Sequence, residues 1–274
     1  MSQPSIFLSH GGGPSYYISV EDTTSRFSAL KGLDKDSKAA QFLRNLTKSQ
    51  QIQRPDCLLV LSAHWEESVC TVNSGSHHTI LYDYGGFPPE TYKIKWPVRG
   101  APDIARRVKK YLEDAGISCS EESKRGLDHG VFVPLKLVYP EADIPVVQVS
   151  LLKSMRMEDH LKIAEALSPL RQNNVLIIGS GFATHSIGQS SIPAQWAKDF
   201  KVWLNDVLTN KSYSPVERKA RLLDFKSLPD FTKAHPTMDH FLPLAMTCAA
   251  AEYGPGKLIY SEFVRSLLNE HYMF

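Results

Sequence analysis

The chain has 274 residues, of which 42% are hydrophobic and 22% charged, so it is long enough to bury a large core. The formal net charge is only +2, and Lys and Arg form no long block or stripe. The short basic run at 106–110 is typical of the solvated face of a helix. A dedicated nucleic-acid binder clusters its cations to displace counterions, so this composition argues against that class.

The N-terminus lacks the pattern of a secretory signal. The apolar residues 6–8 are followed almost at once by His10 and three glycines, too early for the hydrophobic region of a signal peptide. No apolar run approaches the ~18 residues that a membrane span needs. The cysteines form no CxxC pair and are typical of reduced, buried thiols. We therefore predict a cytoplasmic protein with no membrane association, whose four thiols are Cys57, Cys70, Cys119 and Cys248.

Strand-like and helix-like patterns alternate along the chain. Continuous apolar runs such as 57–61 are typical of strands buried on both faces, and Pro102 and Gly116 delimit a helix between them. Pro145 is expected within the first residues of its strand. In chain order we expect strand 5–8, helix 36–49, strand 57–61, helix 102–115, strand 144–149, helix 157–170, strand 175–178, and helices 195–208 and 240–251, which close the chain.

This order predicts an α/β fold with a mixed, largely parallel sheet and helices on both faces. No internal repeat, low-complexity tract or linker is apparent. The segment 210–236 is polar and rich in turn residues, but it is too short for a second domain. We therefore expect one domain over residues 1–274.

Three histidines lie at or just beyond the ends of predicted strands. His10 follows strand 5–8, His64 follows strand 57–61, and His185 lies a turn beyond strand 175–178. Ligands of open α/β sheets collect outside the carboxyl ends of the strands, so these side chains are expected to converge. His129 precedes an apolar helix, and His240 stands at a predicted helix start.

A lone histidine is more often a surface residue or a satisfied core group than a functional one. That interpretation fits His77, His78, His160 and His271. Neighbouring glycines, strand ends and helix starts weaken it for five others, because glycine permits tight turns and close backbone approach; they are His10, His64, His129, His185 and His240. A metal or acid–base site is favoured. Zinc-finger spacing and HExxH are absent, as are the P-loop, the dinucleotide fingerprint and the G-x-S-x-G elbow.

Six blocks together resemble a known family. They are LSHG at 8–11, SAHWE at 62–66, YDYGGFP at 82–88, GLDHG at 126–130, GSG at 179–181 with His185, and HPTMDHFLPL at 235–244. The stretch 139–145 is also similar. In this order, over nearly the whole chain, they resemble the class III extradiol ring-cleavage dioxygenases of the protocatechuate 4,5-dioxygenase catalytic-subunit type. Within that class the chain is similar to the 4,5-DOPA dioxygenase extradiol group.

The resemblance implies a role for each of five histidines. His10, His64 and His240 would be the metal ligands, and His129 and His185 would handle protons and orient substrate. It implies Fe(II) for activity, with Zn(II) able to occupy the site in purified protein. The partners would be a catechol, which is opened to a muconic semialdehyde, and O2. A monomer or small homo-oligomer is expected.

Several alternatives stay open at this stage. His240 fits the third ligand position better than His235, because it directly precedes the helix start. Asp128 either orients a histidine or serves as a turn or cap residue. The loop after His10 has one glycine more than many DOPA-type relatives, which makes DOPA less secure as substrate. A same-fold metal-binding or non-catalytic interaction protein, or a zinc-dependent hydrolase, would also use such histidines.

Overall fold

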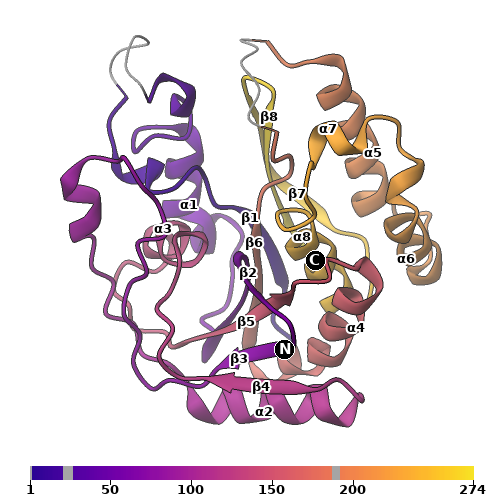
Figure 1. Ribbon diagram of the computed structural model, residues 1–274. Helices are drawn as coiled ribbons and strands as arrows, with labels where there is room; N and C mark the ends of the chain where they lie inside the picture. Colours follow the sequence, from indigo (N-terminus) through magenta and orange to yellow (C-terminus); the bar gives the residue numbers. More distant parts are fainter. Residues whose placement is uncertain (1, 21–26, 187–191) are drawn as a thin grey trace.

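The computed structural model describes residues 2–20, 27–186 and 192–274. Eight strands form one sheet in these residues, in the order β4-β3-β5-β2-β6-β1-β8-β7 (Figure 1). Strands β5, β2, β6 and β1 are mutually parallel, and so are β3 and β4, whereas the β3–β5, β1–β8 and β7–β8 pairs are antiparallel. The strands are β1 Ser5–Ser9, β2 Cys57–Glu67, β3 Cys70–Asn73, β4 Cys119–Glu122, β5 Val146–Leu152, β6 Val175–Gly181, β7 Lys257–Val264 and β8 Leu267–Met273.

Helices cover both faces of this sheet, and each face has its own apolar core. Leu58 and Val60 of β2 pack into the core beneath α1 and α3, while Leu59 and Leu61 pack into the core beneath α2, α4, α5 and α8. This division follows from the pleat, which turns successive side chains to opposite faces. The predicted α/β fold with a mixed, largely parallel sheet is confirmed.

The α-helices are α1 Lys38–Ser49, α2 Pro102–Asp114, α3 His129–Val138, α4 Met157–Leu167, α5 Gln195–Thr209, α6 Pro215–Leu223, α7 Phe231–Ala234 and α8 Leu242–Ala250. Short 3-10 helices span Ser15–Tyr17, Ser28–Leu30, Pro89–Lys93, Ser168–Asn173 and Phe225–Ser227. Segment 210–236 contains α6 and α7, whose Leu222 and Phe231 join the same core as α5. None of the described helices combines the length and apolar content that a membrane span needs.

The structure corrects the predicted end of the chain. Helices were expected to close it, but β7 and β8 form a hairpin that adds to the sheet beside β1. Sequence periodicity misses β8 because it buries polar residues: Glu270 accepts hydrogen bonds from Tyr272 and Ser261, and His271 accepts one from the backbone of Ser9. These partners, of which Ser261 and Ser9 lie on the neighbouring strands, satisfy groups that would otherwise be costly to bury.

Other boundaries shift by a few residues. Strand β5 begins at Val146, just after Pro145, and α4 ends at Leu167, beyond which the chain continues as a 3-10 helix. His64 lies inside β2 instead of following it, because β2 continues past an irregularity between Leu61 and Glu66. All four cysteines are free and buried.

Candidate active site

The carboxyl ends of neighbouring parallel strands bring His10 and His64 together. His10 directly follows β1, and its backbone N–H donates to the carbonyl of Gly181 at the end of β6 (3.0 Å). The irregularity in β2 breaks its register with β5 just before and after His64. As a result Nε2 of His10 lies 3.3 Å from Nε2 of His64.

His240 joins them from the loop before α8, and the glycines of β6 make this approach possible. A Cβ at Gly181 would collide with the carbonyl oxygen of His240, and one at Gly179 would collide with the first turn of α8. Between them, Ser180 donates a hydrogen bond to the carbonyl of Gly130 in α3. The Gly-Ser-Gly end of β6 therefore lets α8 pack directly on the strand and ties α3 to it.

His10, His64 and His240 each offer one ring nitrogen, and these three atoms lie within 4.8 Å of one another. Nε2 of His240 is buried and has no hydrogen-bond partner among the described residues. Two imidazole ligands at the usual ~2.1 Å from one metal ion, roughly at right angles, would place their nitrogens about 3 Å apart. The separation of His10 and His64 and the unpartnered nitrogen of His240 thus fit a divalent transition metal.

Asp239 fixes the orientation of the His240 ring. Its Oδ2 lies 2.7 Å from Nδ1 of His240. Burial acts to raise the pKa of Asp239, but the hydrogen bond to His240, the charge of that ring and the hydrogen bond from Thr237 together hold the pKa well below its ordinary value. A charged carboxylate on Nδ1 sets the proton there and directs the lone pair of Nε2 into the cluster, as the carboxylate partners of metal-bound histidines do.

Asp83 holds His129 in the same way. Its Oδ1 accepts a hydrogen bond from the backbone N–H of His129 (2.8 Å), and its Oδ2 lies 2.9 Å from Nδ1 of that ring. Burial acts to raise the pKa of Asp83, but its hydrogen bonds to His129 lower it overall. The ring centroid of His129 lies 3.9 Å from that of His64. His129 therefore borders the three-histidine set from the start of α3.

His185 borders the set on the side of His240. The two rings are stacked, with centroids 3.5 Å apart and planes within 6°. The backbone N–H of His185 donates to the carbonyl of Ala234 (2.8 Å), which ties this loop to α7. Burial, followed by the charge on His240, lowers the pKa of His185 to about 4. His185 is therefore a neutral base near neutral pH.

Asp128 occupies the N-cap position of α3, as one of the two anticipated roles requires, and its backbone carbonyl accepts hydrogen bonds from Val131 and Phe132. Its buried carboxylate does not contact a histidine ring, and it makes no side-chain cap for α3. It accepts hydrogen bonds from Ser62 (2.7 Å) and Gln148 (2.6 Å) and pairs with Arg125 (3.1 Å). Arg125 also donates to the carbonyl of His64 (2.9 Å). Asp128 thus stabilises the backbone around His64 through Ser62 and Arg125, which both bond to that backbone.

The remaining histidines lie outside the cluster. His235 is enclosed by the rings of Phe200, Phe231 and Phe241, and its Nε2 lies 2.9 Å from the carbonyl oxygen of Ala183. It is a core residue, so the expectation that His240 and not His235 reaches the site agrees with the geometry. The other four are exposed or bond backbone groups: His77, His78, His160 and His271.

Comparison with known proteins identifies the family. Residues 5–273 match the family described as the catalytic LigB subunit of aromatic ring-opening dioxygenase. The chain is 38% identical to the 4,5-DOPA dioxygenase extradiol of Beta vulgaris over 245 residues, which cover 87% of this chain and 90% of that protein. It is 37% identical to the enzyme of the same name from Mirabilis jalapa, over 88% of this chain and 87% of that one.

The chain belongs to the LigB family of extradiol ring-cleavage dioxygenases. The fold agrees with this, since the crystal structure of an uncharacterized protein from Escherichia coli K12 superposes with a TM-score of 0.77 at 25% identity, covering 99% of both chains. The six sequence blocks thus predicted the family correctly.

Sequence reasoning missed two functional features of this dioxygenase. Asp239 was not recognised as the partner of the His240 ring, although its position directly before His240 was a usable signal. Asp83 lies 46 residues from His129, and no local pattern links them.

An aromatic wall beside the cluster was also missed. Tyr84 packs edge-on against Phe87 (centroids 5.5 Å apart), and Phe27 stacks on Phe87 (5.3 Å). A Cβ at Gly13 would lie 2.9 Å from the Phe87 ring, so the glycine loop after His10 packs directly against this wall. Gly13 has a φ of +54°, a left-handed conformation that glycine adopts without strain.

Proposed function

We propose that this dioxygenase uses Fe(II) to open the ring of a catechol to a muconic semialdehyde. His10, His64 and His240 would hold the metal on one side and leave other positions free for substrate and O2. Iron with open positions supplies the route by which electrons pass from the ring to oxygen, as in other non-haem oxygenases. The observation that carries the proposal is the convergence of three imidazole nitrogens within 4.8 Å at the strand ends of a LigB-family fold.

Three neutral imidazoles carry no negative charge, unlike the commoner set of two histidines and one carboxylate. Asp239 supplies part of the missing charge through its 2.7 Å contact with His240, since a carboxylate on Nδ1 makes the ring a stronger donor. A catecholate bound through its two oxygens would supply the rest.

The catechol must lose its protons, and one must later be returned to the cleaved product. His185 is suited to accept a proton, because its pKa of about 4 keeps it neutral and its ring lies against His240. His129 is suited to a second proton step, because its ring lies against His64 and its Nδ1 lies 2.9 Å from the carboxylate of Asp83, which fixes its orientation. The wall that includes Tyr84 and Phe87 would accept the apolar face of an aromatic ring.

We also propose that the enzyme works in the cytoplasm. Its four cysteines are all free, and reducing compartments keep thiols unpaired.

Anaerobic reconstitution tests this function. The metal-free protein is loaded with either Fe(II) or Zn(II), and a catechol and air are then added. DOPA, dopamine, caffeate and protocatechuate form the substrate panel. We expect oxygen uptake and a yellow product with Fe(II) only, for at least one catechol. Hydrolytic activity with Zn(II), or no oxygen uptake with any catechol, would contradict the proposal. Zinc found in purified protein decides nothing, because zinc outcompetes Fe(II) at most nitrogen sites.

A further inference from the structure

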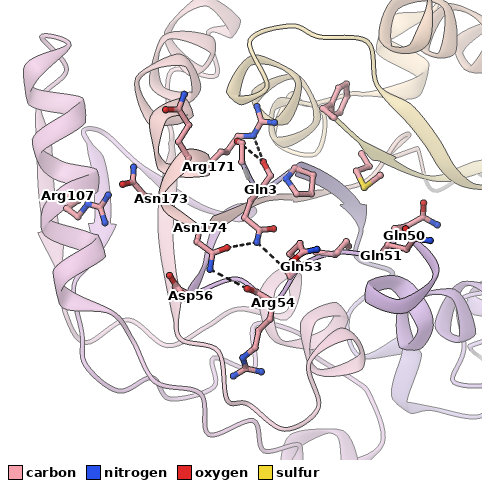
Figure 2. A pocket seen from close by; sticks show the side chains of 16 residues that line it. Gln3, Gln50, Gln51, Gln53, Arg54, Asp56, Arg107, Arg171, Asn173 and Asn174 are labelled. Atoms are coloured by element: carbon pink, nitrogen blue, oxygen red, sulfur yellow. Dashed lines mark hydrogen bonds between the residues drawn. The ribbon is translucent and has the colours of Figure 1, made fainter.

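A pocket lies at the amino ends of the central strands, opposite to the ends that carry the histidines. It forms where the segments that lead into β1, β2 and β6 meet, with the end of β8 and a side chain from α2 at its border (Figure 2). Its volume is about 920 Å³, within the range of small-molecule sites, roughly 300–1,000 Å³. Because the histidines stand at the carboxyl ends of the same strands, the length of β1, roughly 16 Å, separates the two places.

The lining is rich in hydrogen-bonding groups and positively charged. It contains seven side-chain amides and three guanidinium groups against one carboxylate, that of Asp56. Arg54 is neutralised by Asp143, which lies 2.7 Å away outside the pocket lining. Arg107 and Arg171 have no carboxylate within ion-pair distance in the part of the chain that the structure describes. Arg107 and Arg171 thus have no ion-pair partner there, and the side-chain charge of the lining is net positive even with Asp56 counted.

Arg171 is also partly removed from water. Its Nε donates to the backbone carbonyl of Gln3 (2.8 Å) and its Nη1 to the carbonyl of Ala250 (3.1 Å), which fixes the guanidinium plane. Burial lowers the pKa of this group. A desolvated guanidinium in a fixed orientation gains more from an anion than a mobile surface lysine does.

Gln3 lies next to Arg171 and has an unused acceptor. Gln3 is only 3% exposed, and its Nε2 donates to Oδ1 of Asn174 (2.6 Å) and to the carbonyl of Gln53 (3.2 Å). Its Oε1 is buried and accepts no hydrogen bond within the described residues. Figure 2 shows Gln3 in the middle of the pocket, with Arg107 to one side and Gln51 to the other. An unsatisfied buried acceptor of this kind calls for a donor from a bound molecule.

We propose that this pocket binds a small hydroxylated organic anion, such as a sugar phosphate or a sugar acid. The anionic group would pair with Arg107 and Arg171, and a hydroxyl would donate to Oε1 of Gln3. The site is independent of the ring-opening chemistry, since it shares no residue with the histidine cluster.

Titration calorimetry on the metal-loaded protein at constant ionic strength tests the proposal. The probes are ribose 5-phosphate, gluconate and sulfate, the last being an anion with no hydroxyl to donate. We expect one of the two hydroxylated anions to bind at one site per chain, at least about 10-fold more tightly than sulfate, because the Gln3 contact is lost with sulfate. Which of the two binds distinguishes the phosphate from the carboxylate source.

Arg107→Gln should weaken that binding about 10-fold, and no hydrogen bond or ion pair of Arg107 to another described residue would be lost with it. Arg106→Gln is the matched control, because the neighbouring side chain is exposed and pairs with Asp103 instead. Both variants should unfold at the same urea concentration as wild type. The proposal is overturned if neither hydroxylated anion binds saturably, if sulfate binds as tightly, or if Arg107→Gln binds as wild type does. Binding that is lost in His240→Ala but kept in Arg107→Gln would assign it to the histidine site and also overturn the proposal.

Discussion

The carboxylate of Asp239 lies 2.7 Å from Nδ1 of His240, and the opposite ring nitrogen, Nε2, is buried beside His10 and His64 with no hydrogen-bond partner in the described part of the chain. Asp83 stands in the same relation to His129. Two carboxylate–histidine pairs thus serve one site, one directed at the proposed metal and one at the proposed substrate. The difference between the two pairs can be tested by replacing each aspartate with asparagine.

Asp239→Asn should weaken metal binding. An amide cannot supply the negative charge that fixes the His240 ring, and loss of such a partner typically costs about 10–100-fold in metal affinity. Competition with a chromophoric chelator measures the change. Asp83→Asn is the matched variant, which should lower turnover while leaving metal affinity near wild type. Equal metal affinity in Asp239→Asn and wild type would contradict the role assigned to Asp239.

Replacing any of His10, His64 or His240 by Ala should leave the purified protein nearly free of metal, as measured by elemental analysis. His235→Ala is the control from the same block of sequence. It should retain metal but lose about 2–5 kcal/mol of unfolding free energy, because it empties a site enclosed by three phenylalanines. Full metal content in any of the first three variants would remove that residue from the proposed ligand set.

His185→Gln should keep its metal and lose most of its turnover. The ring of His185 stacks on His240 but is not a member of the three-nitrogen set with His10 and His64. General acid–base assistance is typically worth about 10²–10⁴-fold, so the fall in kcat should lie in that range. Metal content and oxygen uptake are measured on the same preparation. A metal-free variant would make His185 a ligand, and full activity would transfer the base role to His129.

The stability of the fold should fall on acidification, in part because of His271. Burial lowers its pKa to about 3, whereas the unfolded chain takes up a proton near the ordinary value of 6.5. Between pH 3 and pH 6.5 the unfolded state binds more protons at this residue than the folded state does. The contribution of neutral His271 to the free energy of unfolding is therefore fully present above pH 6.5. It is lost as the pH falls towards 3, by up to about 1.4 kcal/mol per pH unit.

Urea unfolding of His271→Gln between pH 4.5 and 7.5 should therefore show a shallower pH dependence than wild type. His77→Gln, which removes an exposed histidine, should leave the dependence unchanged. Parallel curves for His271→Gln and wild type would mean that His271 becomes protonated in the folded protein.

Local sequence patterns were sufficient for the central sheet. Apolar runs such as 57–61 and 175–178 become strands buried on both faces, and Gly116 lies two residues beyond the end of α2, because these effects act over a few residues. The order of strands and helices then restricts the topology, so that His10 and His64 had to reach the same edge of the sheet. The ordered motifs identified the family for the same reason, since each lies within a short stretch of chain.

Tertiary structure decided what depends on contacts between distant segments. The hairpin of β7 and β8 is stable because buried polar residues find partners across the strands, as Glu270 does in Ser261, and no periodicity in β8 reveals these contacts. The pairing of Asp83 with His129, and the choice of Asp128 as a support for the His64 backbone, depend on how α3 packs against β2. A carboxylate near a histidine in sequence can point elsewhere, and one far away can contact its ring, because the fold and not the spacing sets the distance between side chains.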